Sequence, residues 1–206
     1  MPKIMQNLYD NLDEAKAFAI SFTNFAYTYD DVNRHYFHTV LCEECGKSIQ
    51  TEDYLAPRAS CKKPTSILDT LEFGVSPELR DDLIAKFDIS EVDFRPVRTK
   101  KGEIVYYQIT PQHKLLPLHI VNDWPILSQC TQCGNVRYND IPQRNDLGED
   151  YYHITPEVLN DMHDMNVTFE HFHRDYPLFV ISRRLYDYLI ERYPRTHYFP
   201  FFLKED

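Results

Sequence analysis

Two short stretches of the sequence share one pattern, Cys42-Glu43-Glu44-Cys45-Gly46 and Cys130-Thr131-Gln132-Cys133-Gly134. A Cys-x-x-Cys turn can direct two sulfurs at one point, and two such turns supply the four sulfurs of a closed tetrahedral zinc site. The glycine after each second cysteine suits a tight reversal of the chain, because glycine adopts positive φ without a steric penalty. The pair therefore predicts one structural Zn²⁺, with the ligands Cys42, Cys45, Cys130 and Cys133.

Two other interpretations of these cysteines remain open, a redox-active dithiol and unrelated buried thiols. A redox Cys-x-x-Cys of the thioredoxin type opens a helix after a strand, and neither turn here is followed by a helical pattern. Apolar or β-prone residues precede each turn, at 36–41 and 124–127, which favours two ribbon-like turns. Because four sulfurs leave no position for water, we expect the metal to stabilise the fold and not to act in catalysis.

The composition is typical of one globular domain. Of the 206 residues, 43% are hydrophobic and 14% aromatic, which is enough for a substantial core. The sequence shows neither an apolar run of about eighteen residues nor a signal-peptide pattern at its start, so we expect no membrane association. Cysteine usage suits the reducing cytoplasm, with Cys61 left as a free thiol of unassigned reactivity.

The net charge of −10 restricts the class of partner. An acidic surface repels phosphate backbones and attracts basic proteins. Many zinc ribbons bind nucleic acid, but this charge makes nucleic acid an unlikely partner and favours a protein with a basic surface.

We predict an α+β fold in a single domain, 1–206. The cysteine turns and their flanking strands, 34–55 and 124–139, form a zinc ribbon. An α+β unit at 67–120 is inserted between them, and a second one at 151–206 ends the chain. The expected architecture is thus a ribbon with two helix-plus-strand units packed on it.

Local patterns predict the elements of the first half. Apolar residues three and four positions apart predict an amphipathic helix over 8–29; they are Leu8, Leu12, Ala15, Phe18, Ala19, Phe22, Phe25 and Ala26. Ser76 and Pro77 are a cap and a first helical residue, so a second helix begins there. Residues 92–97 and 104–109 form a β-hairpin.

In the second half, a polar loop at 139–150 precedes a short helix over 156–166. The C-terminal part then repeats the earlier order of elements. Ser76–Val97 aligns with Ser182–Phe201, pairing Phe94 with Phe199 and Pro96 with Pro200. Residues 106–111 and 151–156 also resemble each other, and together these matches predict two related helix-then-strand units.

With both turns and the C-terminal unit considered, the chain resembles the bacterial double-CxxCG proteins. The features are Cys42-Glu43-Glu44-Cys45-Gly46-Lys47-Ser48, the second turn at 130–134, and a closing pattern from Ile181-Ser182 to Phe199-Pro200. Such proteins are similar to predicted immunity proteins encoded beside polymorphic toxins. The resemblance implies a protein that binds a cognate toxin, and it supplies no catalytic residues.

Other candidate sites are weaker. His163, His171 and His173 suggest a second metal site, but no third ligand has a clear spacing, and ordinary histidines are the simpler interpretation. No phosphate-binding glycine loop or nucleophile motif is present, so we expect no enzymatic activity. Acidic groups such as Glu43-Glu44 and Glu149-Asp150 can face a basic partner or simply be solvated. We therefore expect a cytoplasmic immunity protein that occludes a toxin; the alternative is a zinc-ribbon regulator that contacts nucleic acid or the transcription machinery.

Overall fold

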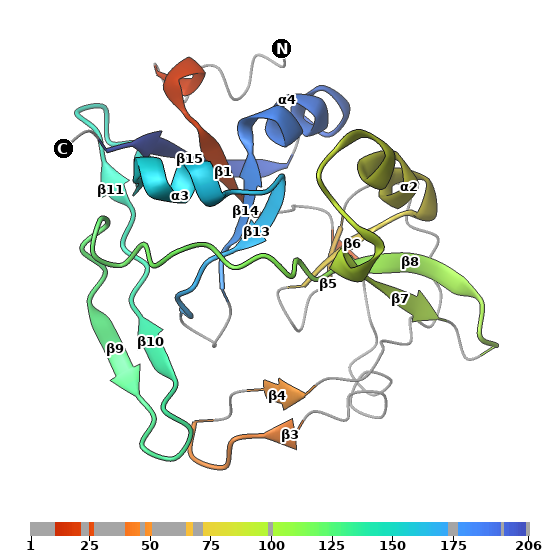
Figure 1. Cartoon of the computed structure of the whole chain (residues 1–206), viewed down its shortest axis with the longest axis horizontal. Coiled ribbons are helices and arrows are strands. Elements are labelled where there is room, and N and C mark those ends of the chain that lie inside the picture. The colour runs from red at the N-terminus through yellow and green to blue at the C-terminus, as the bar shows by residue number, and fades with distance from the viewer. Residues whose placement is uncertain are drawn as a thin grey trace. The chain divides into compact units, whose positions relative to one another are not determined.

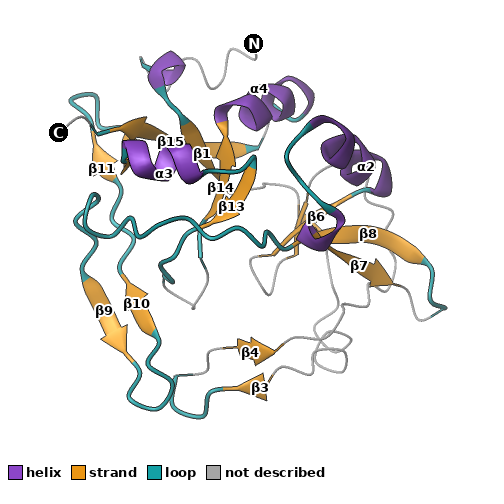
Figure 2. Cartoon of the chain, in the orientation of Figure 1, coloured by secondary structure: helices purple, strands orange, loops and turns teal. Residues whose placement is uncertain are grey.

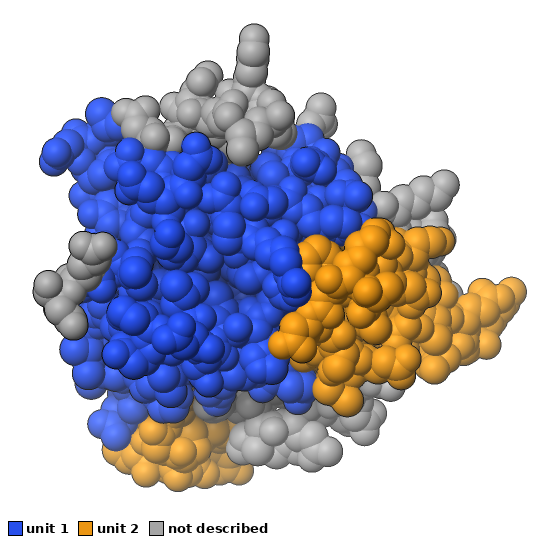
Figure 3. Space-filling model, turned by 45° about the horizontal axis from the view of Figure 1, so that its top comes forward, with its two compact units in different colours: residues 1–21, 112–129, 136–206 blue, residues 22–111, 130–135 orange. Residues whose placement is uncertain are grey.

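The computed structural model describes residues 11–21, 25–26, 40–45, 48–50, 65–67, 72–98, 101–172, 177–194 and 196–204. In these ranges the chain has the predicted α+β composition. It divides into two compact units, coloured separately in Figure 3. Unit 1 contains Met1–Ser21, Gln112–Gln129 and Val136–Asp206, and unit 2 contains Phe22–Pro111 and Cys130–Asn135. The two ranges predicted for the ribbon, 34–55 and 124–139, thus contribute to both units.

Unit 1 is built on a six-stranded sheet with the order β11-β12-β15-β1-β14-β13 (Figures 1 and 2). The strands are β1 (Ala17–Ser21), β11 (Gln143–Arg144), β12 (Asp150–Ile154), β13 (Met165–Val167), β14 (Phe179–Ser182) and β15 (His197–Leu203). The β12–β15 pair is parallel, and the other neighbours are antiparallel. The N-terminal strand β1 therefore lies inside the sheet, between two strands from the C-terminal part of the chain.

Both faces of this sheet are covered by other elements. Helix α4 (Arg183–Arg192) packs on one face, where the ring of its Tyr186 stacks on Phe18 of β1 at 3.6 Å between centroids. The opposite face carries Ala17 and Ala19, because side chains alternate along a strand. That face packs in one apolar core with Val158 of α3 (Pro156–Asp161) and with further buried residues, among them Leu115, Leu118, Trp124, Tyr152, Ile154 and Phe201.

The remaining elements of unit 1 are a short helical turn and a hairpin. The 3₁₀ helix η1 (Leu12–Glu14) precedes β1. Strands β9 (Ile126–Gln129) and β10 (Val136–Tyr138) pair antiparallel and flank residues 130–135 in sequence. The β9 side chains are all exposed, including Ile126 and Leu127.

Unit 2 has a five-stranded sheet with the order β2-β5-β6-β8-β7. Its strands are β2 (Phe25–Ala26), β5 (Thr65–Ile67), β6 (Glu72–Val75), β7 (Phe94–Arg98) and β8 (Ile104–Ile109), with α2 (Pro77–Lys86) and η2 (Glu91–Asp93) between β6 and β7. A separate pair, β3 (Val40–Leu41) and β4 (Ser48–Gln50), flanks the first cysteine turn. The predicted helix after Ser76 and the hairpin that follows it are confirmed.

The same strand–helix–strand arrangement occurs in each unit. In unit 2, β6–α2–β7 brackets β8, which is antiparallel to both strands; in unit 1, β14–α4–β15 brackets β1 in the same way. Both helices have ten residues and begin after a serine whose Oγ accepts a hydrogen bond from a backbone N–H at 3.2 Å, that of Leu79 after Ser76 and that of Leu185 after Ser182. The sequence repeat at Ser76 and Ser182 is therefore a structural repeat.

The strand registers of the two units agree. Val75 and Pro96 both pair with Tyr107, and Ile181 and Pro200 both pair with Phe18. Pro96 therefore corresponds to Pro200, as the sequence alignment predicted. Two residues earlier, Phe94 corresponds to Tyr198 and not to Phe199, so that part of the alignment was off by one.

Three predicted elements differ from the structure. The helix predicted over 8–29 is wrong for the described residues 11–21 and 25–26, which contain η1 and the strands β1 and β2. The predicted helix over 156–166 ends at Asp161, and 165–167 form β13 instead, paired with β14. The loop predicted at 139–150 contains β11 and the first residue of β12.

The resemblance between 106–111 and 151–156 does not belong to the repeat. The first segment lies largely in β8, the middle strand of its copy of the repeat, whereas the second lies largely in β12, on the outer side of β15.

The described helices include none with the length and apolar character to cross a bilayer.

Candidate metal centre

The four predicted ligands lie together, all within unit 2. The sulfur-to-sulfur distance is 3.7 Å between Cys42 and Cys130 and 3.6 Å between Cys45 and Cys133. All four sulfurs lie within 4.8 Å of one another. A tetrahedral ion with metal–sulfur bonds of ~2.3 Å requires sulfurs separated by about 3.8 Å. The geometry thus fits one tetrahedral metal ion, and the separations far exceed the ~2.05 Å of a disulfide.

The second turn shows how the backbone aims its sulfurs. The N–H of Cys133 points to the Cys130 sulfur at 3.5 Å, and the N–H of Gly134 donates to the Cys130 carbonyl at 3.1 Å. Gly134 has φ +72°, which glycine adopts without strain. The Cys130 N–H donates to the Asn135 carbonyl at 2.8 Å, which closes the turn. The glycine expected in the second turn is confirmed, and Gly46 lies outside the described residues.

The third residue of each turn holds the other turn. The Glu44 carboxylate accepts hydrogen bonds from the N–H of Thr131 at 3.1 Å, its hydroxyl at 2.9 Å, and the N–H of Gln132 at 2.8 Å. In return, the Gln132 side-chain oxygen accepts one from the Glu44 N–H at 3.1 Å and lies 3.4 Å from the Cys42 sulfur. We call Glu44 and Gln132 the cross-turn clamp. It joins two segments 88 residues apart in sequence independently of a metal.

The electrostatics of the turns favour thiolate at one position and oppose it at others. The N–H of Cys45 lowers the pKa of the Cys42 thiol to about 7, from an ordinary value of 9.0. At Cys130 the N–H of Cys133 acts in the same direction, but burial and the Cys45 sulfur outweigh it and raise the pKa of that thiol. Several thiolates at this spacing repel one another. A bound cation is what allows all four sulfurs to ionise together.

The four cysteines differ in burial. Cys42 and Cys130 are buried, whereas Cys45 is half-buried and Cys133 is exposed. Four protein ligands complete a tetrahedron and leave no position for a substrate or an activated water. The sulfurs are also too close together to enclose a cluster of several metal ions. The arrangement is therefore compatible with one structural ion.

The clamp predicts an effect on metal retention. We expect Glu44→Ala to weaken metal binding by about 10- to 100-fold, the usual cost of losing a group that orients metal ligands. The substitution removes all three bonds that Glu44 accepts from the second turn. Competition with a chromogenic chelator measures the affinity. The matched control is Glu43→Ala, an exposed neighbour; equal affinities of the two variants would contradict the orienting role of Glu44.

The histidines considered for a second metal site lie apart from these cysteines in sequence. The His163 ring stacks on His113 at 4.2 Å, and His171 forms an isolated bridge with Arg137. Across the described ranges, the four cysteines form the single group of three or more metal-ligand side chains that are close enough to share an ion. His173 and Cys61 lie outside those ranges.

Sequence reasoning missed the clamp. Glu44 was considered only as a solvated acidic residue or a contact for a partner, and Gln132 was not considered. The available signal was their equal position within the two turns, third in each Cys-x-x-Cys. Hydrogen bonds lower the pKa of the Glu44 carboxyl, and the bond from the Thr131 N–H has the largest effect. The carboxyl is therefore ionised at neutral pH. The charged carboxylate accepts hydrogen bonds from the second cysteine turn.

The functional argument rests on the residues themselves. The four cysteines and the clamp explain how the two turns meet, and they identify no substrate or partner. Comparison of the chain with models of known protein families, with curated proteins and with solved structures gave no match.

Proposed function

We propose that this protein binds one Zn²⁺ through Cys42, Cys45, Cys130 and Cys133 and acts as a protein-binding module. Four thiolates in tetrahedral geometry suit zinc among the common biological metals. The spacing of 3.6–3.7 Å between paired sulfurs is the observation that supports the metal part of the proposal. Zinc stabilises the fold here, and the activity is binding and not turnover.

The proposed activity is neutralisation of a cognate bacterial toxin by occlusion, in the cytoplasm. Support comes from the resemblance of the two Cys-x-x-Cys-Gly turns to the double-CxxCG proteins and from the net charge of −10. Four thiolates contribute −4 and the ion +2, which takes the charge of the zinc-loaded protein to −12. Such a protein attracts a basic toxin and repels nucleic acid.

Co-expression with the product of an adjacent toxin gene tests this function. We expect a one-to-one complex of nanomolar affinity or better, on the order of −12 kcal/mol. Cells that carry the toxin should survive only with this protein. Added salt should slow association more than it speeds dissociation, because charges at the rim of an interface act mainly on approach. Surface plasmon resonance at several salt concentrations separates the two rates.

Variants define what a positive result means. Cysteine variants of the metal centre should lose protection only to the extent that they unfold, and Cys61→Ser should protect fully. Failure to bind or neutralise the adjacent gene product would contradict the toxin hypothesis. Salt-sensitive binding to DNA or RNA would instead favour the regulator, the alternative that the sequence left open.

A further inference from the structure

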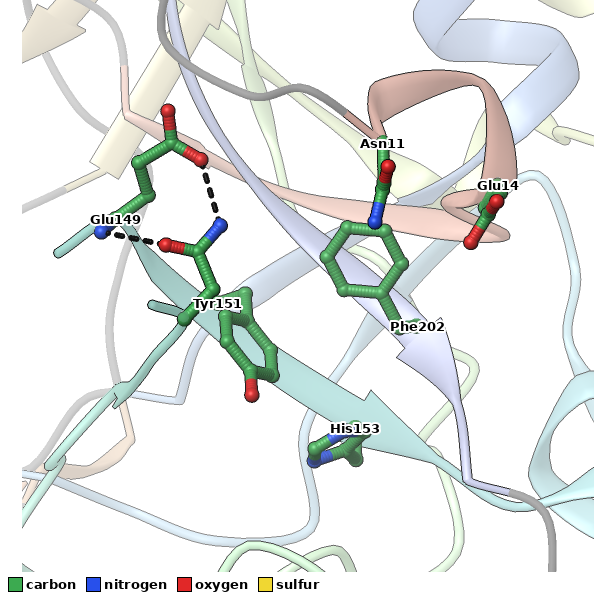
Figure 4. Close-up of a pocket in the computed structure, with 7 residues that line it drawn as sticks. Asn11, Glu14, Glu149, Tyr151, His153 and Phe202 are labelled. Atoms are coloured by element: carbon green, nitrogen blue, oxygen red, sulfur yellow. Dashed lines mark hydrogen bonds between the residues drawn. The ribbon is translucent and has the colours of Figure 1, made fainter. Parts of the chain in front are cut away.

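Unit 1 contains a pocket with aromatic and acidic walls, apart from the cysteines. It has a volume of about 220 Å³, and its lining residues are Asn11, Glu14, Asn145, Glu149, Tyr151, His153 and Phe202 (Figure 4). Pockets for small molecules and cofactors usually measure ~300–1,000 Å³. This one is too small for most such ligands and has the size for one long side chain.

The base of the pocket is formed by three rings from adjacent strands. Tyr151 and His153 lie two positions apart on β12, so they share a face of the sheet, and Phe202 of β15 pairs with His153. This is the face on which α4 covers β1 and β14. The Tyr151 ring is nearly perpendicular to both others, with centroids 5.1 Å from His153 and 5.4 Å from Phe202. All three residues are half-buried, and the face of an aromatic ring attracts a cation placed over it.

Two carboxylates and two amides border these rings. Glu14 is the last residue of η1, and Asn11 is the residue immediately before it. On the other side, Glu149 accepts a hydrogen bond from the Asn145 amide at 2.7 Å, and its N–H donates to the Asn145 side-chain oxygen at 3.0 Å (Figure 4). Within the described residues, neither Glu14 nor Glu149 has an ion-pair partner, so their negative charge is not neutralised by a neighbouring cation.

The other charges near the pocket leave its negative character intact. Burial, together with the nearby Lys204 ammonium, lowers the pKa of His153, so this ring is neutral at pH 7 and does not repel a cation. The Lys204 ammonium donates to the Val121 carbonyl at 3.3 Å and is not one of the residues that line the pocket. Arg144 is paired with Asp150. The uncompensated groups that line the pocket are therefore carboxylates beside aromatic faces.

We propose that this pocket receives an arginine side chain of the protein partner. A guanidinium stacks on aromatic rings and donates hydrogen bonds to carboxylates in one plane, and the pocket presents both kinds of group. The overall charge of −10 favours a partner whose surface carries such cations. This assignment deepens the proposed function and rests on it for the partner, whereas the chemistry of the pocket can be tested without any toxin.

Titration of the ¹⁵N-labelled full chain with argininamide tests the assignment, because the amide represents an arginine within a polypeptide. We expect saturable shifts of the backbone signals of 145–153 and 202, with a dissociation constant on the order of millimolar. Citrullinamide has a neutral group of nearly the same shape and should give no saturable shift. Zinc content and toxin binding do not enter this measurement, so its failure is distinct from failure of the proposed function.

Two pocket variants and one control locate the site. Glu149→Gln can keep the bond from Asn145 but loses the charge, and Phe202→Leu keeps bulk but loses the aromatic face. Each should weaken argininamide binding by about threefold. Glu191→Gln removes an exposed carboxylate of α4 outside the pocket and should leave binding unchanged. A preserved spectrum away from the pocket confirms that each variant is folded.

Several results would overturn the assignment. These are the absence of saturable shifts with argininamide, equal shifts with citrullinamide, and equal weakening by Glu191→Gln. Micromolar binding of free arginine or agmatine would also overturn it, because the pocket would then be a small-molecule site and not the receptor for a partner's side chain. If a toxin complex is obtained, Glu149→Gln and Phe202→Leu should weaken it as well; unchanged affinity would remove the pocket from the interface.

Discussion

Cys130→Ser should lower the melting temperature by about 10–20 °C, and a strong zinc chelator should do the same to the unaltered protein. The proposed ion would link two turns that have 84 residues between them, 46 to 129. A cross-link that closes a loop of this length removes about 4–5 kcal/mol of chain entropy from the unfolded state. For a chain of this size, each kcal/mol corresponds to about 2–4 °C.

The loss of folding free energy should be at least as large as this entropic contribution, because metal binding itself also contributes free energy to folding. In small zinc domains the free energy of metal binding is free energy of folding. The clamp of Glu44 and Gln132 remains after metal loss, but its hydrogen bonds lie at an exposed part of the surface. Exposed hydrogen bonds exchange readily with water and cannot replace four metal–sulfur bonds.

Calorimetry and elemental analysis test this expectation together. The purified protein should contain one zinc per chain, and Cys130→Ser should have lost it. Cys61→Ser is the matched control and should keep both the zinc and the melting temperature. A melting curve that does not change after confirmed metal removal would show that the centre has no structural role. Absence of zinc from the untreated protein would reject the metal assignment itself.

The clustering of the four cysteines could be predicted because its signal is local. A Cys-x-x-Cys-Gly turn carries its chemistry within five residues, and four such cysteines need only meet. The clamp depends on which backbone groups of one turn face the other, which no spacing within a turn determines. The aromatic pocket was likewise unpredictable, because it combines η1, β12, β15 and the turn at 145–149, which lie far apart in sequence.

The internal repeat was visible because its helix signal is also local. Ser76 and Ser182 each cap a helix, and a proline follows in the next strand of each copy. The middle strand of each copy, β8 in unit 2 and β1 in unit 1, could not be recognised from the sequence. β8 follows the helix of its copy in the chain, whereas β1 precedes both outer strands and the helix of its copy. The two copies thus have the same spatial order of elements with different chain order, and sequence alignment cannot show a permuted strand.

The central position of β1 explains why the sequence wrongly predicted a helix over 8–29. β1 is central, so neither of its faces is solvent-exposed, and Ala17, Phe18, Ala19 and Ile20 are all buried. A strand buried on both faces lacks the polar–apolar alternation that identifies half-buried strands. The apolar residues at Ala15, Phe18 and Ala19 then matched a helical spacing by default. Partners for β1 come from residues 179–203, beyond the reach of any local pattern.

Ala17→Asp tests the position of β1 and should destabilise the protein by about 3–5 kcal/mol, the cost of an unpaired charge in a core. In the helix predicted over 8–29, Ala17 was outside the apolar face, where aspartate would be tolerated. In the structure its side chain is fully buried, in the core that contains Trp124 and Phe201. The substitution therefore distinguishes a central strand from an amphipathic helix.

Lys16→Asp is the matched control for this test. It introduces the same carboxylate one residue earlier, at an exposed position, and surface substitutions usually change stability by less than about 0.5 kcal/mol. Urea denaturation followed by tyrosine and tryptophan fluorescence measures both variants. We expect the urea midpoint to fall for Ala17→Asp alone. The decrease should be larger at neutral pH than at pH 4, because at pH 4 a buried aspartate takes up a proton and its charge is lost. Equal midpoints for the two variants would place Ala17 at the surface and remove β1 from the centre of the sheet.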